Sequence, residues 1–462
     1  MSSWVPIGRR VLAASLLAVS LSACAAPGFA HTPAAVASPP AGAGAGAGSA
    51  SSAPVGATCP EGLPSGAQCY AGRSEEGAYY WMAVPAHWNG VLVMHSHGGP
   101  RTQTPEANDE IDDLQRFSVM VREGYAWAGS TYRRGGYGVR MAAEDTDILR
   151  RIFWERFGRP KYTLLHGQSW GGNVAAKAAE LYAVDGDGQK NYDGVLLTAG
   201  VLGGGTRSYR FRADLRAVYQ FYCRNHPRLD EVQYPVWRGL PADARMTRAE
   251  LTARVEQCTG VGLPAGERTV EQARKLDNIV RVIGIREDEL VSHLWWATNL
   301  FQDLVQARLD GANPFSNIGV AYSGSDDDVA LNAGVERFQA DPMAVARLAY
   351  DADLSGLIML PTLTLHAKND PTALVGLEAL YRDTVAAAGR SDLLVQTFTD
   401  EEQHSKLSTP EYAGLLEALM GWIARGEKPT PASVAAACEA RSAAYGEACL
   451  FDIGYVPIVP KR

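Results

Sequence analysis

The chain of 462 residues can form one large domain or two to three ordinary ones, and its 46% hydrophobic and 20% charged side chains are typical of a globular protein. Its 51 acidic and 43 basic residues give a formal net charge of -8, and the sequence has no basic stripe that could neutralise a phosphate backbone. This balance argues against a nucleic acid as a partner.

Residues 1–23 have the pattern of a secretory signal peptide. A basic pair precedes an apolar run from Val11 to Cys24, which is too short to span a bilayer but suits the central part of such a peptide. The end of the run resembles the lipobox of bacterial lipoproteins, in which Cys24 would be lipidated; cleavage after Ala30, which removes Cys24, is the alternative. We expect an exported protein, either a lipoprotein on the periplasmic side of the outer membrane or a secreted one.

Residues 24–58 consist almost entirely of Ala, Gly, Pro, Ser and Val, which predicts a flexible tether. Of the seven cysteines, six remain when Cys24 is set aside, and an even number in an oxidising compartment predicts disulfides. Proximity favours the pairs Cys59–Cys69, Cys223–Cys258 and Cys438–Cys449, although sequence alone leaves the other connectivities open. No Cys-x-x-Cys pair or His-rich cluster suggests a metal site.

Beyond the tether, short apolar runs alternate with longer amphipathic ones, which is the pattern of parallel strands joined by helices. The predicted strands are Tyr79–Val84, Val91–Ser96, Tyr125–Ser130, Tyr162–His166, Gly194–Ala199, Pro361–His366 and Leu393–Phe398. Helices are predicted over Met141–Phe157, Trp170–Tyr182 and Glu411–Ile423. We therefore divide an α/β core into residues 59–202 and 355–426, followed by a C-terminal tail of residues 427–462.

Residues 203–354 interrupt this alternation. Long amphipathic pieces such as Glu267–Ile283 and Asp288–Leu309 occur there, with little that predicts a strand. We interpret the stretch as a helical cap, or lid, over the carboxyl ends of the strands, where open α/β sheets bind ligands. The candidates for lining a pocket there are Tyr234, Trp237, Trp295, Trp296 and Phe301.

A Gly-x-Ser-x-Gly motif places Ser169 between a predicted strand and a predicted helix. Gly167-Gln168-Ser169-Trp170-Gly171 follows the strand that begins at Tyr162, so it has the strand, turn and helix that a nucleophile elbow requires. Glycines there allow a strained turn that exposes the serine oxygen. Ser169 is therefore the predicted nucleophile, and the backbone N–H of Trp170, at the helix N-terminus, is a predicted oxyanion donor.

A serine nucleophile needs a base that a carboxylate orients, and both residue types follow in the order expected after an elbow. Asp370 lies just beyond the strand that ends at His366, and His404 lies beyond the next strand. We predict Asp370 as the acid and His404 as the base. The alternatives are a carboxylate from Asp326–Asp328 and a purely structural turn at Asp370; His366 is interpreted as a core residue.

The second oxyanion donor should come from the loop after an early strand, and His97-Gly98-Gly99-Pro100 follows Val91–Ser96. We predict the N–H of Gly99, with Gly98 as the alternative. His97 is interpreted as a structural residue of this loop.

The pair of motifs, His-Gly-Gly-Pro and Gly-x-Ser-x-Gly-Gly, resembles the α/β-hydrolase superfamily, with similarity to prolyl oligopeptidase-type and prolyl aminopeptidase-type members and to secreted esterases. The resemblance implies a mainly parallel sheet of about eight strands flanked by helices, no cofactor and acyl-enzyme chemistry. We expect a carboxylic ester hydrolase that acts on a small ester. The alternatives are a serine exopeptidase acting on short peptides and an inactive surface binding protein, and contact with a membrane is expected only through a lipid at Cys24.

Overall fold

The computed structural model describes residues 53–460. The predicted signal peptide, Cys24 and nearly all of the predicted tether lie outside the described residues. Within residues 53–460, no helix is both long and apolar enough to cross a membrane.

A nine-stranded sheet in the described residues forms the centre of the fold, with the order β1-β2-β3-β5-β4-β6-β7-β8-β9. Its strands are β1 (Val55–Ala57), β2 (Gln68–Arg73), β3 (Tyr79–Val84), β4 (Val91–Ser96), β5 (Ala126–Ser130), β6 (Tyr162–Gln168), β7 (Gly194–Thr198), β8 (Thr362–Ala367) and β9 (Leu394–Thr399). Pairing is antiparallel from β1 through β3 to β5 and parallel from β5 to β9. The predicted mainly parallel sheet is confirmed, and all seven predicted strands are present within two residues of their predicted ends.

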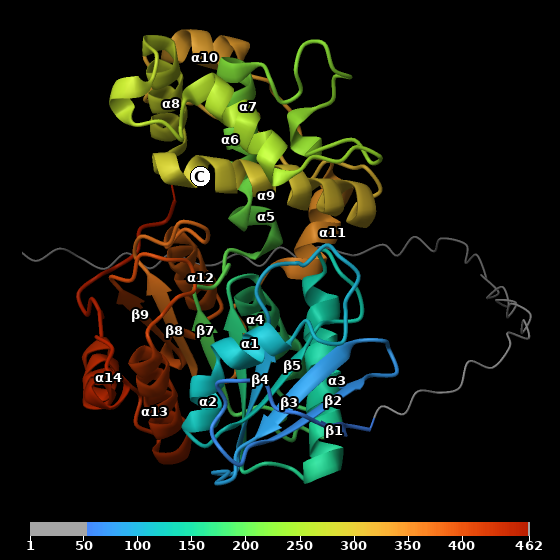
Figure 1. Ribbon diagram of the computed structural model, residues 1–462, viewed down its shortest axis with the longest axis vertical. Helices are drawn as coiled ribbons and strands as arrows, with labels where there is room; N and C mark the ends of the chain where they lie inside the picture. The colour runs from blue at the N-terminus through green and yellow to red at the C-terminus, as the bar shows by residue number, and fades with distance from the viewer. Residues whose placement is uncertain (1–52, 461–462) are drawn as a thin grey trace, which may run out of the picture. The chain divides into compact units, whose positions relative to one another are not determined.

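The central strand β4 is buried along its whole length because helices cover both faces of the sheet (Figure 1). Helices α3 (Val139–Phe157) and α4 (Trp170–Tyr182) pack on one face, and α2 (Ser118–Arg122) and α13 (Thr409–Arg425) pack on the other. In β4, Leu92 and Met94 belong to the first of these cores, while Val91 and Val93 belong to the second. The predicted helices therefore lie where the alternation of strands and helices requires them.

Two elements at the ends of the described chain were not predicted. The last residues of the predicted tether form β1, where Val55 pairs with Ala71 of β2. Strands pair through backbone hydrogen bonds, which form between residues with small side chains too. In the predicted tail, Pro431–Tyr445 forms α14, which packs on α13 through Val434 and Cys438. The prediction of a flexible tether as far as residue 58 is therefore wrong for its last residues, which form β1.

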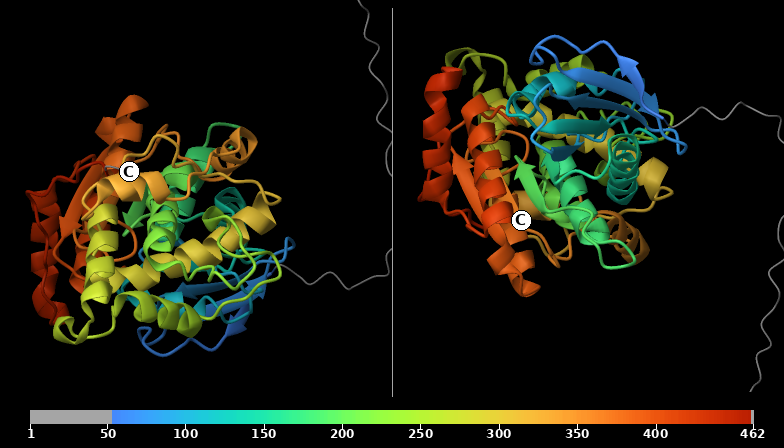
Figure 2. Two further views of the ribbon diagram at one scale, coloured as in Figure 1. Left: turned by 90° about the horizontal axis from the view of Figure 1, so that it is seen from above. Right: turned by 90° about the horizontal axis from the view of Figure 1, so that it is seen from below.

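Helices dominate the segment between β7 and β8, and Figure 1 shows them above the carboxyl ends of the strands. They are α5 (Gly204–Ser208), α6 (Arg210–Cys223), α7 (Arg248–Thr259), α8 (Val270–Ile283), α9 (Leu290–Gln302), α10 (Asp328–Gly334) and α11 (Pro342–Ala352). Seen from above, α9 and the neighbouring helices cross over the sheet (Figure 2). We call this segment the cap.

Three disulfides tie local pieces of the chain together, and all three predicted pairs are confirmed. Cys59–Cys69 joins the segment after β1 to β2, Cys223–Cys258 joins the ends of α6 and α7 in the cap, and Cys438–Cys449 closes the segment after α14.

Candidate active site

Ser169 lies in a sharp turn between β6 and α4, with backbone angles φ 59° and ψ -124°. A non-glycine residue in this left-handed region is strained, and such strain is held only where the surroundings fix it. Gly171 shows why the motif needs glycine, because a Cβ atom on it would lie 2.0 Å from the carbonyl oxygen of Ser96 at the end of β4. Glycine is therefore required at residue 171, because the main chains at the start of α4 and at the end of β4 leave no room for a side chain between them.

The three predicted catalytic side chains meet at the carboxyl edge of the sheet. The Nε2 atom of His404 is 2.7 Å from the Oγ atom of Ser169, and its Nδ1 atom is 2.8 and 2.9 Å from the two carboxylate oxygens of Asp370. Since the carboxylate only accepts, Nδ1 donates to Asp370 and Nε2 is left to take the serine proton. This connected arrangement can turn a hydroxyl into a nucleophile.

Asp370 is a buried carboxylate that the turn after β8 supplies with donors. Its Oδ1 atom accepts the backbone N–H groups of Thr372 and Ala373 at 2.8 and 2.9 Å. Burial alone raises the pKa of Asp370, but the hydrogen bond and charge of His404 outweigh burial and lower this pKa below its usual value. The alternative acids are placed elsewhere: Asp326 accepts from Arg274 at 2.9 Å, within the cap.

The loop that carries His404 runs from the end of β9 to the start of α13 and is held at both ends by the segment that follows α14. At one end, the N–H of Asp400 donates to Leu450 (2.8 Å) and the N–H of Asp452 donates to Phe398 (2.9 Å). At the other end, the hydroxyl of Ser408 donates to the carbonyl of Ala448 at 2.9 Å.

Three more contacts hold this loop beside the nucleophile. Thr409 donates its N–H to the carboxylate of Glu447 at 2.8 Å. In the middle of the loop, Ser405 accepts hydrogen bonds from Gln168, which precedes the nucleophile, and from Arg116. The position of His404 therefore depends on residues far from it in the sequence, which the sequence did not identify.

The loop after β4 brings Gly99 to the same place. Gly99 has φ +69°, and it lines the cleft that holds Ser169 and His404. His97 lies buried at the start of this loop with its Nδ1 atom 3.0 Å from the carbonyl oxygen of Gly98, and burial lowers its pKa to about 3. A neutral, hydrogen-bonded imidazole agrees with a structural role for His97. As the first residue of α4, Trp170 has a backbone N–H without an intrahelical acceptor, so both predicted donors remain candidates.

A cleft of about 620 Å³ opens over Ser169 between the core and the cap. The cap contributes Trp295, Trp296, Asn299 and Leu300, and the tip of Trp296 lies 3.8 Å from where a Cβ on Gly99 would stand. Two of the five predicted aromatic residues thus line the cleft. The other three do not line it: Phe301 is buried against Phe315, and Tyr234 and Trp237 pack within the cap.

The charged residues that line this cleft, within the described part of the chain, are the two arginines Arg101 and Arg116. Arg101 is neutralised, because its guanidinium lies 2.9 Å from both Glu110 and Asp113. Arg116 is exposed, and among the described residues no carboxylate lies close enough to form an ion pair with it. The cleft therefore carries positive charge and no acidic side chain.

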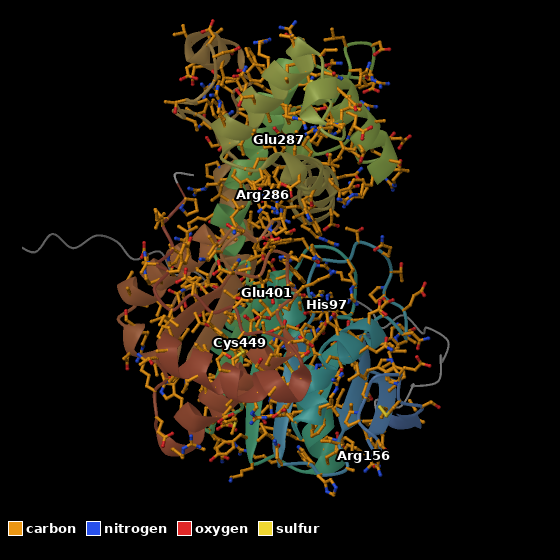
Figure 3. The ribbon with its side chains drawn as sticks, turned by 60° about the vertical axis from the view of Figure 1, so that its left-hand side comes forward. His97, Arg156, Arg286, Glu287, Glu401 and Cys449 are labelled. Atoms are coloured by element: carbon orange, nitrogen blue, oxygen red, sulfur yellow. A yellow bond between two sulfur atoms is a disulfide. The ribbon has the colours of Figure 1, made fainter. Side chains whose placement is uncertain are left out.

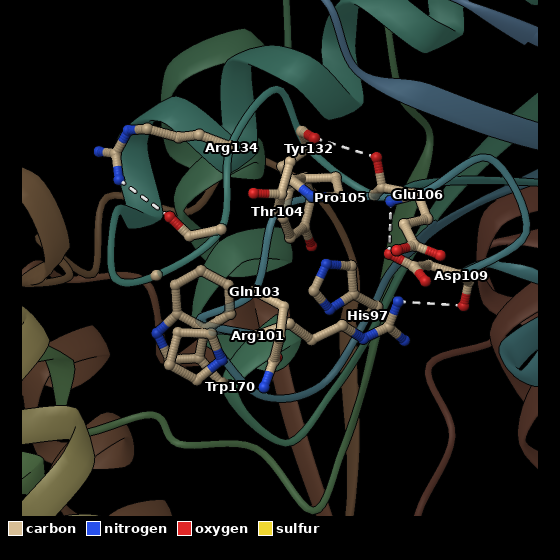
Figure 4. Close-up of a pocket in the computed structure, with 14 residues that line it drawn as sticks. His97, Arg101, Gln103, Thr104, Pro105, Glu106, Asp109, Tyr132, Arg134 and Trp170 are labelled. Carbon is tan, nitrogen blue, oxygen red and sulfur yellow. Dashed lines mark hydrogen bonds between the residues drawn. The ribbon is translucent and has the colours of Figure 1, made fainter. Parts of the chain in front are cut away.

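A second cavity, of about 350 Å³, lies beside the cleft and shares Pro100, Arg101 and Gln103 with it. Figure 4 shows His97 and the side chain of Trp170 at this cavity, and Trp170 is not among the residues that line the cleft over Ser169. The loop that carries Gly99 thus has a cavity on each side.

The cap and the core also meet next to the acid. Arg286, labelled with Glu287 in Figure 3, donates to the backbone carbonyl of Asn369 at 3.1 Å, one residue before Asp370. No group of three or more His, Cys, Asp or Glu residues in the described chain is arranged to hold a metal ion.

The mainly parallel sheet, the strained elbow after β6 and the cap between β7 and β8 make this an α/β-hydrolase fold. No protein-family model matches the chain. The chain is 28% identical over 120 residues to an o-phthalyl amidase from Xanthobacter agilis, a match that covers 25% of this chain and a quarter of that protein's length.

Among solved structures, an esterase from Aspergillus oryzae aligns with a TM-score of 0.43 and 16% identity, over 79% of this chain and 80% of that one. Feruloyl esterase B from the same organism aligns with a TM-score of 0.43 and 13% identity, over 79% of this chain and 81% of that one.

Proposed function

We propose that the protein is a serine hydrolase that cleaves a carboxylic ester through an acyl-enzyme intermediate. The proposal rests on one observation, the unbroken set of hydrogen bonds from Asp370 through His404 to the oxygen of Ser169. Ser169 attacks the ester carbonyl while His404 takes its proton, and Asp370 stabilises the imidazolium. The N–H groups of Gly99 and Trp170 receive the oxyanion. His404 then returns the proton to the leaving alcohol, and water releases the acid by the reverse path.

The charge of the cleft favours an ester over a peptide with a free amino terminus. An exopeptidase that removes amino-terminal residues must hold an ammonium group, which calls for a carboxylate or another acceptor in the cleft. The described residues that line the cleft include Arg101 and Arg116 but no Asp or Glu. The amidase relative keeps amide cleavage as the second candidate, because an amide without a free amine needs no acidic partner.

Labelling with a fluorophosphonate, followed by turnover of 4-nitrophenyl acyl esters and aminoacyl 4-nitroanilides, tests the proposal. We expect labelling and ester turnover in the wild-type protein and the loss of both in S169A, by several orders of magnitude in kcat. Unlabelled wild-type protein without turnover would instead identify a binding protein on a hydrolase fold, and preferred turnover of nitroanilides would identify a peptidase.

We further propose that the cap serves as a lid for a small ester and that the protein works outside the cytoplasm. Trp295 and Trp296 of the cap line the cleft, and three disulfides suit an oxidising compartment. Attachment through a lipid at Cys24 is tested by comparing palmitate incorporation in the wild-type protein and in C24S, whereas a secreted form would incorporate none.

A further inference from the structure

A second histidine lies directly behind the catalytic acid. His366, near the end of β8, has no exposed surface, and its Nε2 atom lies 3.7 Å from the Oδ2 atom of Asp370. The same Nε2 atom is 2.7 Å from the carbonyl oxygen of Ala373, and Nδ1 is 3.3 Å from the Oε1 atom of Glu378. The mechanism proposed above assigns this imidazole no role.

The neighbours of His366 determine where its protons lie. A carbonyl oxygen only accepts, so Nε2 carries a proton that it donates to Ala373. Glu378, in α12 (Gly376–Ala387), accepts on its Oε2 atom from Gln396 at 2.5 Å and from Thr364 at 3.0 Å. The Nε2 atom of Gln396 is also 2.9 Å from the backbone carbonyl of Glu378, which identifies that nitrogen as the donor. These donors stabilise an ionised carboxylate at Glu378, which in turn accepts a proton held on Nδ1 of His366.

We infer that His366 is an imidazolium in the folded protein and that, paired with Glu378, it acts as the positioning residue for Asp370. The inference deepens the proposed function and rests on it for the catalytic role, while the charge of His366 can be measured without any assay of activity.

The charges around His366 support the imidazolium. Asp370 and Glu378 face it from two sides, and a cation between two carboxylates lowers their mutual repulsion. Burial alone lowers the pKa of His366, but the hydrogen bond that His366 donates to Glu378 and the charge of Asp370 outweigh burial and raise this pKa. The cap adds charges of both signs nearby, since Arg212 donates to the carbonyl of Thr372 at 2.8 Å, Arg286 donates to the carbonyl of Asn369 at 3.1 Å, and Glu289 interacts with Asp370. His404 completes the titratable groups around Asp370.

His366 also fixes the turn that presents the acid. It donates to the carbonyl of Ala373, whose own N–H donates to the Oδ1 atom of Asp370 at 2.9 Å. The imidazole therefore holds the peptide that orients the carboxylate and places a positive charge behind it. Both effects keep Asp370 ionised and aimed at His404.

Nuclear magnetic resonance of histidine rings tests the charge directly. Full-length protein labelled with 15N in the imidazole rings is recorded near pH 7, and H366Q assigns the His366 signals. We expect both ring nitrogens of His366 to be protonated. An unprotonated Nδ1 at this pH would mean a neutral pair, with the proton on Glu378, and would overturn the inference.

Kinetics of H366Q and E378Q on a 4-nitrophenyl ester test the positioning role. Glutamine at residue 366 keeps a donor for Ala373 but cannot carry a charge, and E378Q removes the carboxylate that holds the second proton. We expect kcat to fall about tenfold in each variant, with KM changed less than twofold, because the loss affects the acid and not the cleft. The acidic limb of the pH profile of kcat/KM should move to higher pH, because loss of a positive charge makes nearby protonation easier.

H166Q is the matched control, because His166 is also a fully buried histidine near a strand end, and its partners are His95 and Thr198 instead of Asp370. A loss of stability alone would affect H366Q and H166Q alike and leave both pH profiles in place, and this result would refute the positioning role. If the wild-type protein cleaves no ester at all, the proposed function fails, yet the ring protonation still decides the charge of His366.

Discussion

The disulfide Cys438–Cys449 should control the catalytic histidine through the segment that follows α14. Five hydrogen bonds join residues 447–452 to the two ends of the His404 loop. At about 1 kcal/mol each, they hold the segment in place by about 5 kcal/mol. The disulfide closes a loop with a sequence separation of 11, and losing such a closure costs about 3 kcal/mol. Without the bridge, the population in which the segment has detached should therefore rise about 100-fold.

The double variant C438S/C449S tests this coupling, and C59S/C69S is its matched control. Cys59–Cys69 has a sequence separation of 10, so its closure entropy is nearly the same, but it lies on β2 at the opposite edge of the sheet from β9. Ester turnover and far-ultraviolet circular dichroism are followed together across a urea titration. We expect activity to disappear before the fold in C438S/C449S, and activity and fold to disappear together in C59S/C69S. Coincident transitions in both variants would refute the coupling.

Three further changes follow from described contacts. G171A should lower the free energy of unfolding by about 3 kcal/mol or more, measured by urea denaturation, because its Cβ would overlap the Ser96 carbonyl; an unchanged midpoint would contradict the fit of the elbow. R116Q should reduce about fivefold the preference in kcat/KM for a mono-4-nitrophenyl succinate over 4-nitrophenyl butyrate, since an exposed charge contributes about 1 kcal/mol; an equal ratio in both proteins would exclude Arg116 from charge selection. Burial alone raises the pKa of Asp113, but its contacts with His95 and Arg101 outweigh burial and lower it, so its contribution to stability is present above about pH 4 and is lost as the pH falls. Thermal unfolding of the wild-type protein should show this decline, and D113N should show less of it.

The parallel part of the fold could be predicted because its strands are continuous apolar runs. Strands such as β4 and β7 are buried on both faces, and a strand buried on both faces appears in the sequence as a run of mainly apolar residues. The antiparallel edge leaves no such pattern, since β1 consists of Val-Gly-Ala and pairs through its backbone. Helix α14 was missed for a related reason: many of its residues are alanine and only Val434 and Cys438 are buried.

The candidate catalytic side chains could be proposed from the sequence because each follows a strand in the chain order expected of this fold. The residues that hold these side chains in place could not be predicted, because their positions depend on how elements far apart in the sequence pack against one another. Nothing in the sequence places Glu378 beside His366, or the residues after Cys449 beside the His404 loop. His366 was interpreted as core, and it is indeed buried, but burial alone does not reveal that its neighbour is the acid.

The elbow glycines have a consequence for how this protein can change. Residue 171 must be glycine because the start of α4 and the end of β4 approach too closely for a Cβ atom between them. The glycine of the motif therefore reflects the distance between two main chains. The two other positions of the motif are constrained by their side chains instead: Gln168 donates a hydrogen bond to Ser405, and the indole of Trp170 lies against the neighbouring cavity. Substitution is therefore excluded at Gly171 by the neighbouring main chain, whereas at Gln168 and Trp170 it is limited by side-chain contacts.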